Sequence, residues 1–469
     1  MFSSFSALSL RRRGAARLAA AVLVSGVVAA GAMAAAGPAA AVETSQNQGG
    51  AIATIGSLKT YGAAVIHGDD GDQQVSAGLF EMSVDGGGTL QTYCVDLHNP
   101  TQRDARYHET PWSGTSLGVN KDAGRIRWIL ENSYPQVNDL AALAEEAGIN
   151  GGLTEQDAAA GTQVAIWRYS DAADVDAVDP QAEKLADYLQ KTARTVSEPK
   201  ASLTLAPSAV SGRPGGLLGP VTVHTNADSV TVTPPADAAM SGVRIVGKDG
   251  RAVTAARDGS QLYFDVPDDA TSGTAELTVQ ASTTVPVGRA FTSESRSQTQ
   301  ILAGSSESTV SATASAAWAA KGAVPALSAV KNCAKGHVDI TAANEGDKAF
   351  TFELMGVEHS IAAGESRTVT IPFQEDQAYD FTITGPAGFE KRFTGVLDCK
   401  TQGSAGGTAT QTLSEPSPAT VGGTSTGTNL AETGGSSTTP LIAGVAIGLV
   451  VIGGAALLLA GRKQTPTRD

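Results

Sequence analysis

Between residues 200 and 400 the chain repeats one short pattern, and this pattern limits its fold more than any other feature. Short runs alternate apolar and polar side chains with a period of two, and turn residues such as Asp249-Gly250 separate many of them. Period two is typical of strands with one buried face. The runs lie at 202–205, 230–232, 243–246, 262–266 and 277–279, and again at 338–340, 350–354, 368–371 and 379–383. Two successive β sandwiches are therefore predicted, a stalk domain over 200–310 and a domain of immunoglobulin type over 325–400.

The part before residue 200 has a different pattern, with helical as well as strand signals. Residues 89–97 read as a strand, and 122–133, 140–147, 154–169 and 180–192 read as helices. Thr154 followed by Asp157 is close to a capping box, and Pro180 suits the first position of a helix. The predicted fold class is therefore multidomain: an α+β domain over 42–199, followed by the two all-β domains. The segment 305–321 between the sandwiches is rich in Ala and Ser and is predicted to be a linker or a short helix.

The N-terminus and the charge indicate a secreted protein that does not bind nucleic acid. Four arginines precede an apolar run over 18–36, and Ala39-Ala40-Ala41 follows it. This is the layout of a cleavable signal peptide, here 1–41, with a membrane anchor as the alternative. The formal net charge of -14 disfavours binding to phosphate backbones. The mature chain is expected in an oxidising compartment.

The three cysteines divide into a pair and a single residue. Cys333 and Cys399 stand just outside the first and last strands of the domain over 325–400, so a disulfide between them is expected. Closing that loop would contribute about 4 kcal/mol in the chain-entropy model. Cys94 is left alone in its own domain. It is either a small buried apolar residue or a reactive thiol.

A reactive role for Cys94 requires a partner, and Gln163 is the candidate. Gln163 shares one face of the predicted helix with Ala159 and Trp167. Small residues on that face would let a strand approach, and Trp167 would shield the site from water. The thiol could then attack the carboxamide and expel ammonia, leaving an internal thioester. A target lysine could open it to give an isopeptide bond on Gln163 in a single turnover, so the protein is predicted not to be an enzyme.

These residues also carry a family resemblance. Tyr93-Cys94 followed by Thr162-Gln163-Val164-Ala165-Ile166-Trp167 resembles the thioester domain of Gram-positive surface proteins, with its Thr-Gln-x-Ala box. The resemblance implies a Cys94–Gln163 crosslink in a surface adhesin. Complement-type thioesters, which use neighbouring Cys and Gln residues in one loop, do not fit this spacing.

The C-terminus carries a second resemblance. Leu430-Ala431-Glu432-Thr433-Gly434 precedes an apolar span over 440–460 and a basic tail. The order of parts resembles the sorting signal of actinobacterial surface proteins, here 430–469. It implies that a sortase joins Thr433 to peptidoglycan, whereas a single-pass membrane protein is the alternative. The Gly, Ser and Thr-rich segment 401–429 is predicted to be a disordered, wall-spanning linker.

Weaker candidates remain beside this main prediction. Asp96 and His98 would lie on Cys94's face if the strand continued, and either could move a proton. An acidic stretch at 69–72 suggests calcium but lacks the full ligand pattern, so no metal or other cofactor is predicted. The alternatives in function are a non-covalent or structural wall protein and a hydrolase that uses Cys94 with His98 or His108. The identity of the amine-bearing target is not encoded in any motif.

Overall fold

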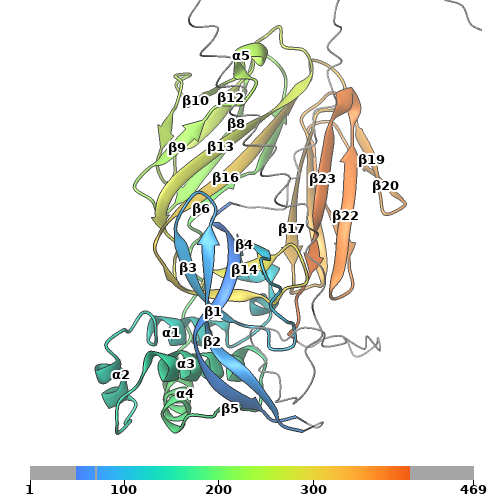
Figure 1. Ribbon diagram of the computed structural model, residues 1–469. Coiled ribbons are helices and arrows are strands. Elements are labelled where there is room, and N and C mark those ends of the chain that lie inside the picture. Colours follow the sequence, from blue (N-terminus) through green and yellow to red (C-terminus); the bar gives the residue numbers. More distant parts are fainter. Residues whose placement is uncertain (1–48, 69–70, 402–469) are drawn as a thin grey trace, which may run out of the picture.

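The computed structural model describes residues 49–68 and 71–401. Figure 1 shows three parts: helices and long strands at one end, a β sandwich at the other, and a third, all-β part alongside. The signal peptide, the linker and the sorting signal, including Leu430, Ala431, Glu432, Thr433 and Gly434, lie outside the described residues. So do Asp69 and Asp70 of the acidic stretch. Within the described residues, no helix is long and apolar enough to span a membrane.

The N-terminal part is built on one antiparallel sheet with the order β2-β3-β15-β14-β4-β1-β5 in the described chain. Because β1 also pairs with β2, six of these strands close into a ring. The strands are β1 (Ile52–Ile66), β2 (Gln73–Val84), β3 (Thr89–Cys94), β4 (Arg106–Thr110), β5 (Val175–Ala177), β14 (Ala290–Ser293) and β15 (Gln300–Ser305). Of these, the sequence pattern had indicated only the strand at 89–97, and that strand ends three residues earlier, at Cys94.

Two strands of this sheet come from a segment that the sequence pattern had assigned to the stalk domain over 200–310. β14 pairs with β4, and β15 pairs with β3, so the yellow β14 lies beside the blue β4 in Figure 1. The expected border at residue 199 therefore does not separate the two parts. No strand had been predicted at 290–305, and strand pairing across some two hundred residues leaves no local signal.

Helices cover one face of the sheet, and all four predicted helices are confirmed. They are α1 (Ala123–Glu131), α2 (Leu140–Glu146), α3 (Glu155–Ser170) and α4 (Pro180–Thr192), with short 3-10 turns at Trp112–Gly114 and Ser116–Gly118. The capping box of α3 is present, since Thr154 accepts from the Asp157 amide at 3.1 Å and Asp157 accepts from the Thr154 amide at 3.0 Å. Gly161 lets α4 approach, because a Cβ there would lie 2.4 Å from the Ala182 carbonyl oxygen.

The second part is formed by two facing sheets of the described chain, with orders β10-β12-β8-β6 and β11-β9-β13-β16-β7. Its elements are β6 (Leu203–Ala206), β7 (Ala209–Gly212), β8 (Leu217–Thr225), β9 (Val230–Thr233), α5 (Ala238–Ser241), β10 (Arg244–Val246), β11 (Ala255–Ala256), β12 (Gln261–Asp265), β13 (Gly273–Thr284) and β16 (Glu307–Trp318). The expectation of a linker or helix over 305–321 is wrong. β16 pairs with β13 along its whole length, and its alternate residues are buried.

The third part contains β17 (Pro325–Asn332), β18 (His337–Asn344), β19 (Phe350–Leu354), β20 (Val357–Ile361), β21 (Glu365–Pro372), β22 (Gln377–Thr384) and β23 (Glu390–Leu397). They pair in three small sheets around one apolar core. The predicted disulfide between Cys333 and Cys399 is confirmed, with an S–S distance of 2.03 Å. The immunoglobulin-type architecture of the two β parts stays a prediction.

The core divides along the two faces of the N-terminal sheet. Residues such as Phe80 and Met82 of β2 pack in one cluster with Leu277 and other side chains of the sandwich. Residues of the opposite face, including Leu79, pack with the helices and with Cys94. Because successive side chains of a strand point to opposite faces, one sheet joins the helical layer to the sandwich.

Candidate functional site

The structure brings Cys94 and Gln163 together, as the sequence predicted. Cys94 ends β3, Gln163 lies in the middle of α3, and each is 1% exposed. The Cys94 amide donates to Gln163 Oε1 at 3.0 Å, and Gln163 Nε2 donates to the Cys94 carbonyl oxygen at 2.8 Å. The two bonds fix which end of the carboxamide is oxygen, because an N–H must face an acceptor and a C=O a donor. The backbone of Cys94 therefore holds the Gln163 carboxamide beside its own side chain.

Small residues allow α3 to lie this close to the sheet. Ala158, Ala159 and Ala160 are fully buried on α3. Gly62 of β1 faces Ala160, and a Cβ on this glycine would lie 3.0 Å from the Ala160 Cβ, which is tighter than ordinary contact. The close approach that small residues of this helix were expected to allow is thus present at Ala160. The approach brings Gln163 within hydrogen-bonding distance of Cys94.

The Cys94 thiol lies in an environment that favours its protonated form. It donates to the Asp96 carbonyl oxygen at 3.0 Å and accepts from the Asp96 amide at 3.3 Å. Burial raises the pKa of the Cys94 thiol well above its ordinary value, and the nearby carboxylates of Asp171 and Asp96 raise it further. The Asp96 amide and the Trp167 indole lower this pKa in part. A thiol that must act as a nucleophile here needs a base to remove its proton.

Trp167 covers the site, and its indole N–H has no oxygen or nitrogen acceptor among the described residues. The side chain is 1% exposed and lies one helical turn beyond Gln163, in the same apolar cluster as Cys94. Its Nε1 is buried without a hydrogen-bond acceptor among the residues that the structure describes. The indole therefore excludes water from the sulfur, and its N–H has no acceptor other than the weak one the sulfur offers.

Asp96 and His98 do not lie where a continued strand would have placed them, because β3 ends at Cys94 and the chain turns. The Asp96 carboxylate accepts from the amides of His98 at 3.2 Å and Asn99 at 3.3 Å, and from Asn99 Nδ2 at 2.6 Å. Burial raises its pKa to about 6 despite these donors. Asp96 thus stabilises the turn after Cys94, and its oxygens are largely occupied.

The sequence reasoning missed Asp171. This residue caps the C-terminus of α3 and is 5% exposed. Its Oδ1 accepts from the Leu97 amide at 3.0 Å, and its Oδ2 accepts from the Ser170 hydroxyl at 2.5 Å. Burial raises the pKa of Asp171 to about 8, and the charge of Asp96 adds to the effect. The sequence did contain a signal for Asp171, because the four-residue spacing of Gln163, Trp167 and Asp171 places all three on one helical face.

The segment 290–305 supports the turn that carries Cys94. Gln300 of β15 lies opposite Cys94 in the ladder, and the Val95 amide donates to the Thr299 carbonyl oxygen at 3.1 Å. Gln298 Nε2 donates to the carbonyl oxygens of Asp96 at 3.2 Å and Asn99 at 2.6 Å. The turn is therefore fixed by residues that lie between the sandwich strands β13 and β16 in sequence.

The end of the third part reaches the same region and adds negative charge. Burial and the charges of Asp96, Asp376 and Glu375 raise the pKa of Asp398 to about 7. A side-chain hydrogen bond from Thr401 lowers the pKa of Asp171 in part. Oxygens of Glu375, Asp376 and Asp398 lie within 4.8 Å of one another. The Cys94 site is therefore bordered by carboxyl groups from two parts of the molecule.

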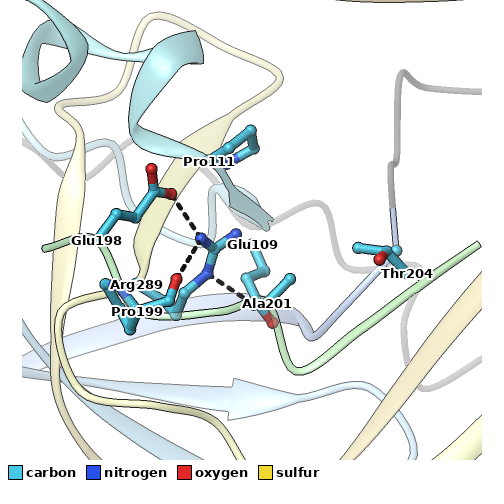
Figure 2. A pocket seen from close by; sticks show the side chains of 8 residues that line it. Glu109, Pro111, Glu198, Pro199, Ala201, Thr204 and Arg289 are labelled. Atoms are coloured by element: carbon cyan, nitrogen blue, oxygen red, sulfur yellow. Dashed lines mark hydrogen bonds and ion pairs between the residues drawn. The ribbon is translucent and has the colours of Figure 1, made fainter. Parts of the chain in front are cut away.

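A second buried polar cluster, shown in Figure 2, lies apart from this site and joins the first two parts. Arg289 is 4% exposed and donates to Glu109 Oε1 at 2.9 Å and Glu198 Oε1 at 2.7 Å. Glu109 also accepts from the amides of Ser202 at 2.9 Å and Ala51 at 3.2 Å. The cluster lines a pocket of about 340 Å³, which neither Cys94 nor Gln163 lines. Its groups are paired, so we interpret it as a structural junction.

Comparison with known families gives two matches. Residues 91–195 match the family described as "Thioester domain", and this segment contains Cys94, Gln163, Trp167 and Asp171. Residues 319–396 match the family described as "Bacterial phospholipase C, C-terminal domain". A search of curated proteins gives no match.

Solved structures with some likeness include the Bacillus anthracis TIE protein, with 14% identity over 74% of this chain and 80% of that chain and a TM-score of 0.26. The thioester domain of the Enterococcus faecium TIE86 protein has 15% identity over 57% of this chain and 96% of that chain, with a TM-score of 0.27. Likeness at this level carries no further argument. The family match and the geometry together support a thioester-domain protein with a mostly β multidomain fold.

Proposed function

We propose that the protein is a cell-wall surface adhesin that binds its target covalently through an internal thioester between Cys94 and Gln163. The observation that carries this proposal is the pair of hydrogen bonds by which the Cys94 backbone holds the Gln163 carboxamide, inside a segment that matches the thioester domain family. The remaining steps follow from the chemistry of that pair.

Thioester formation starts from the resting geometry. Cys94 Sγ attacks Cδ of Gln163, the C–N bond breaks, and ammonia leaves. The Cys94 amide, 3.0 Å from Oε1, is placed to stabilise the negative charge that develops on this oxygen. Burial of both residues keeps water from the product.

In coupling to a target, Cys94 becomes the leaving group, and Gln163 Cδ is again the atom attacked. A lysine amine of the target attacks Cδ, the C–S bond breaks, and an isopeptide bond joins Gln163 to the target. Cys94 is released as a thiol. Each molecule reacts once, so the protein is a single-turnover coupling reagent. Since Cys94 and Gln163 are each 1% exposed, a local opening must precede attack by a protein amine.

The experiment is an intact mass measurement on the purified mature protein. After allowance for the two hydrogens lost in the Cys333–Cys399 disulfide, the thioester form is expected to be lighter than the sequence mass by one ammonia, and Cys94→Ala is expected to have its full calculated mass. Incubation with methylamine should add one methylamine to Gln163 and make Cys94 available to a thiol reagent. A wild-type protein of full sequence mass with a free thiol contradicts the proposal.

The methylamine reaction also separates the covalent adhesin from a structural wall protein. A thioester that forms but resists methylamine, and that no lysine-bearing partner opens, would serve only as an internal crosslink. The third candidate, a cysteine hydrolase, has little support. In the described residues, no hydrogen bond joins Cys94 to a histidine, and the raised pKa of the Cys94 thiol is the opposite of what such enzymes need.

The wall attachment is a separate part of the proposal and rests on the motif at 430–434. A sortase is expected to cleave after Thr433 and join its carboxyl group to peptidoglycan. In the native host, digestion of the wall should release the protein with a wall fragment on Thr433. The variant Thr433→Ala is expected to remain in the membrane fraction. Recovery of the wild type there as well would contradict wall anchoring.

A further inference from the structure

We propose that Asp171 is the residue that transfers protons in both reactions of the Cys94–Gln163 pair. This inference rests on the proposed function and deepens it, since it assigns a proton acceptor to a site whose thiol and carboxamide supply none.

The register of α3 brings Asp171 to the turn that carries the thiol. Gln163 bonds Cys94, Trp167 packs in the same cluster as the thiol, and Asp171 accepts from the Leu97 amide at 3.0 Å. Successive residues at four-residue spacing on α3 thus follow the chain from Cys94 to Leu97. The charge of Asp171 acts on the Cys94 thiol more strongly than that of Asp96 does.

The other acids near the pair are less suitable. Asp96 is held by three N–H donors of its own turn, which stabilise its charged form and cannot reverse their bonds when the carboxylate takes up a proton. Asp398 belongs to the third part, and its charge is opposed by Lys331. Asp171 has one backbone donor and two hydroxyl neighbours, Ser170 and Thr401, and a hydroxyl can reverse its bond when the carboxylate takes up a proton.

Asp171 balances both reactions without another reactant. In formation, the carboxylate takes the thiol proton as Sγ attacks Cδ, and it returns this proton to the nitrogen that leaves as ammonia. In coupling, a target lysine arrives as an ammonium ion and gives one proton to the Asp171 carboxylate. The second proton passes from the attacking nitrogen to Sγ as the C–S bond breaks. The products are the isopeptide, a thiol and a protonated Asp171.

The surroundings of Asp171 suit this task. Burial, together with the charge of Asp96, brings its pKa to about 8, near the pH at which the protein would work. The groups that face it are the Leu97 amide, the hydroxyls of Ser170 and Thr401, and the ionisable Cys94 and Asp96. A carboxyl group with a pKa near neutrality can both accept and return a proton.

The test compares Asp171→Asn with the wild type in the full mature protein. The amide can still accept from the Leu97 amide but cannot accept a proton. Opening of the thioester is followed by intact mass with methoxyamine, which stays deprotonated across neutral pH, so any change of rate with pH reports on the protein. The wild-type rate is expected to rise through an inflection near or above neutrality. In Asp171→Asn the rate should fall about 100-fold or more and the inflection should disappear.

The matched control is Asp187→Asn, which removes an exposed carboxylate of α4 that pairs with Arg168 of α3 at 2.9 Å. It is expected to keep the wild-type rate and inflection. The unfolding temperature shows whether Asp171→Asn folds. If it folds but the Gln163 carboxamide has not reacted, thioester formation is followed at rising pH. Formation restored at high pH, where hydroxide replaces the carboxylate, supports the inference.

Two results would overturn the inference while leaving the proposed function intact. One is an Asp171→Asn protein that forms and opens its thioester with the wild-type rate and pH profile. The other is loss of the inflection in Asp96→Asn but not in Asp171→Asn. If Asp171→Asn does not fold, the wild-type profile alone decides, and a rate that is flat with pH overturns the inference. A wild type without the mass loss of one ammonia contradicts the proposed function itself.

Discussion

Two buried polar clusters of this protein have opposite characters. Around Arg289, each charged group meets a partner: the guanidinium lies between Glu109 and Glu198, and Glu109 also accepts backbone amides. Around Cys94, the buried indole N–H of Trp167 has no acceptor among the described residues except the weak one that the thiol offers, and the partners of the buried Asp96 and Asp171 carboxyl groups are hydrogen-bond donors of the turn and of nearby hydroxyls. A paired cluster lowers the free energy of the fold, whereas an unpaired one keeps reactive groups at a cost in stability.

The same sheet carries both clusters, but each lies where the sheet contacts a different part of the molecule. Glu109 is in β4 and Cys94 ends the neighbouring ladder of β3 and β15. The Arg289 cluster sits where the sheet meets the sandwich, and the Cys94 cluster sits where it meets α3. The structural junction therefore lies where this sheet meets the sandwich, and the reactive site lies where it meets the helices.

The largest expected effect comes from Gln163→Asn. Shortening the side chain by one methylene draws the carboxamide away from the Cys94 backbone, so the thioester should not form and coupling to amines should be abolished. Loss of two buried hydrogen bonds is expected to cost about 1–3 kcal/mol of stability. Intact mass and denaturant unfolding measure the two effects. A thioester in this variant would show that the hydrogen-bonded pair is not required.

A large effect on stability, without an effect on chemistry, is expected from Arg289→Met. Removing the cation leaves Glu109 buried and uncompensated, which typically costs about 3–5 kcal/mol. The folded fraction should still carry the thioester. The matched control is Arg106→Met, which breaks an exposed pair with Asp85 and should cost about 0–1 kcal/mol. Equal losses in the two variants would contradict the structural role of the Arg289 cluster.

The acids around Cys94 should make stability depend on pH in a characteristic direction. Their pKa values are raised in the folded protein, to about 6 for Asp96, about 7 for Asp398 and about 8 for Asp171. The folded state therefore holds more protons than the unfolded chain between pH 4 and 8, and stability falls as the pH rises through this range. One such group contributes at most about 1.4 kcal/mol per pH unit.

Denaturant unfolding of the wild type and of Asp171→Asn from pH 4 to pH 9 measures this dependence. The variant should lose stability less steeply as the pH rises. The difference should be largest between pH 6 and 8, where Asp171 contributes most of the pH dependence. A wild type that gains stability over the same range would show that these acids are charged and well paired in the folded protein.

The smallest expected effect is that of the cap of α3. Thr154→Ala removes the hydroxyl that accepts from the Asp157 amide, and loss of such a cap costs about 1 kcal/mol. Because Thr154 lies more than two turns from Gln163, the thioester should form at the wild-type rate. A slower formation would show that fraying of the helix start reaches the reactive pair.

Part of this molecule is determined by its sequence alone. The helix over 155–170 follows from the capping box and the spacing of its apolar residues, and Pro180 marks the start of α4. The strands of the third part follow from alternation, and the pairing of Cys333 with Cys399 follows from their positions at its ends. Each of these signals is local, or lies within one domain, so one chain segment is enough to reveal it.

The tertiary structure decides what completes the site. The hairpin over 290–305 pairs with β3 and β4 although it lies between the sandwich strands β13 and β16 in sequence, and the strand over 307–318 was not recognised. Asp171 accepts hydrogen bonds from the Leu97 amide and from Thr401. No periodicity in the sequence predicts these long-range contacts. The sequence determined which two residues can react. Only the packing of distant strands and one helix decided which acid stands beside them, because burial and neighbouring charge are properties of the folded chain.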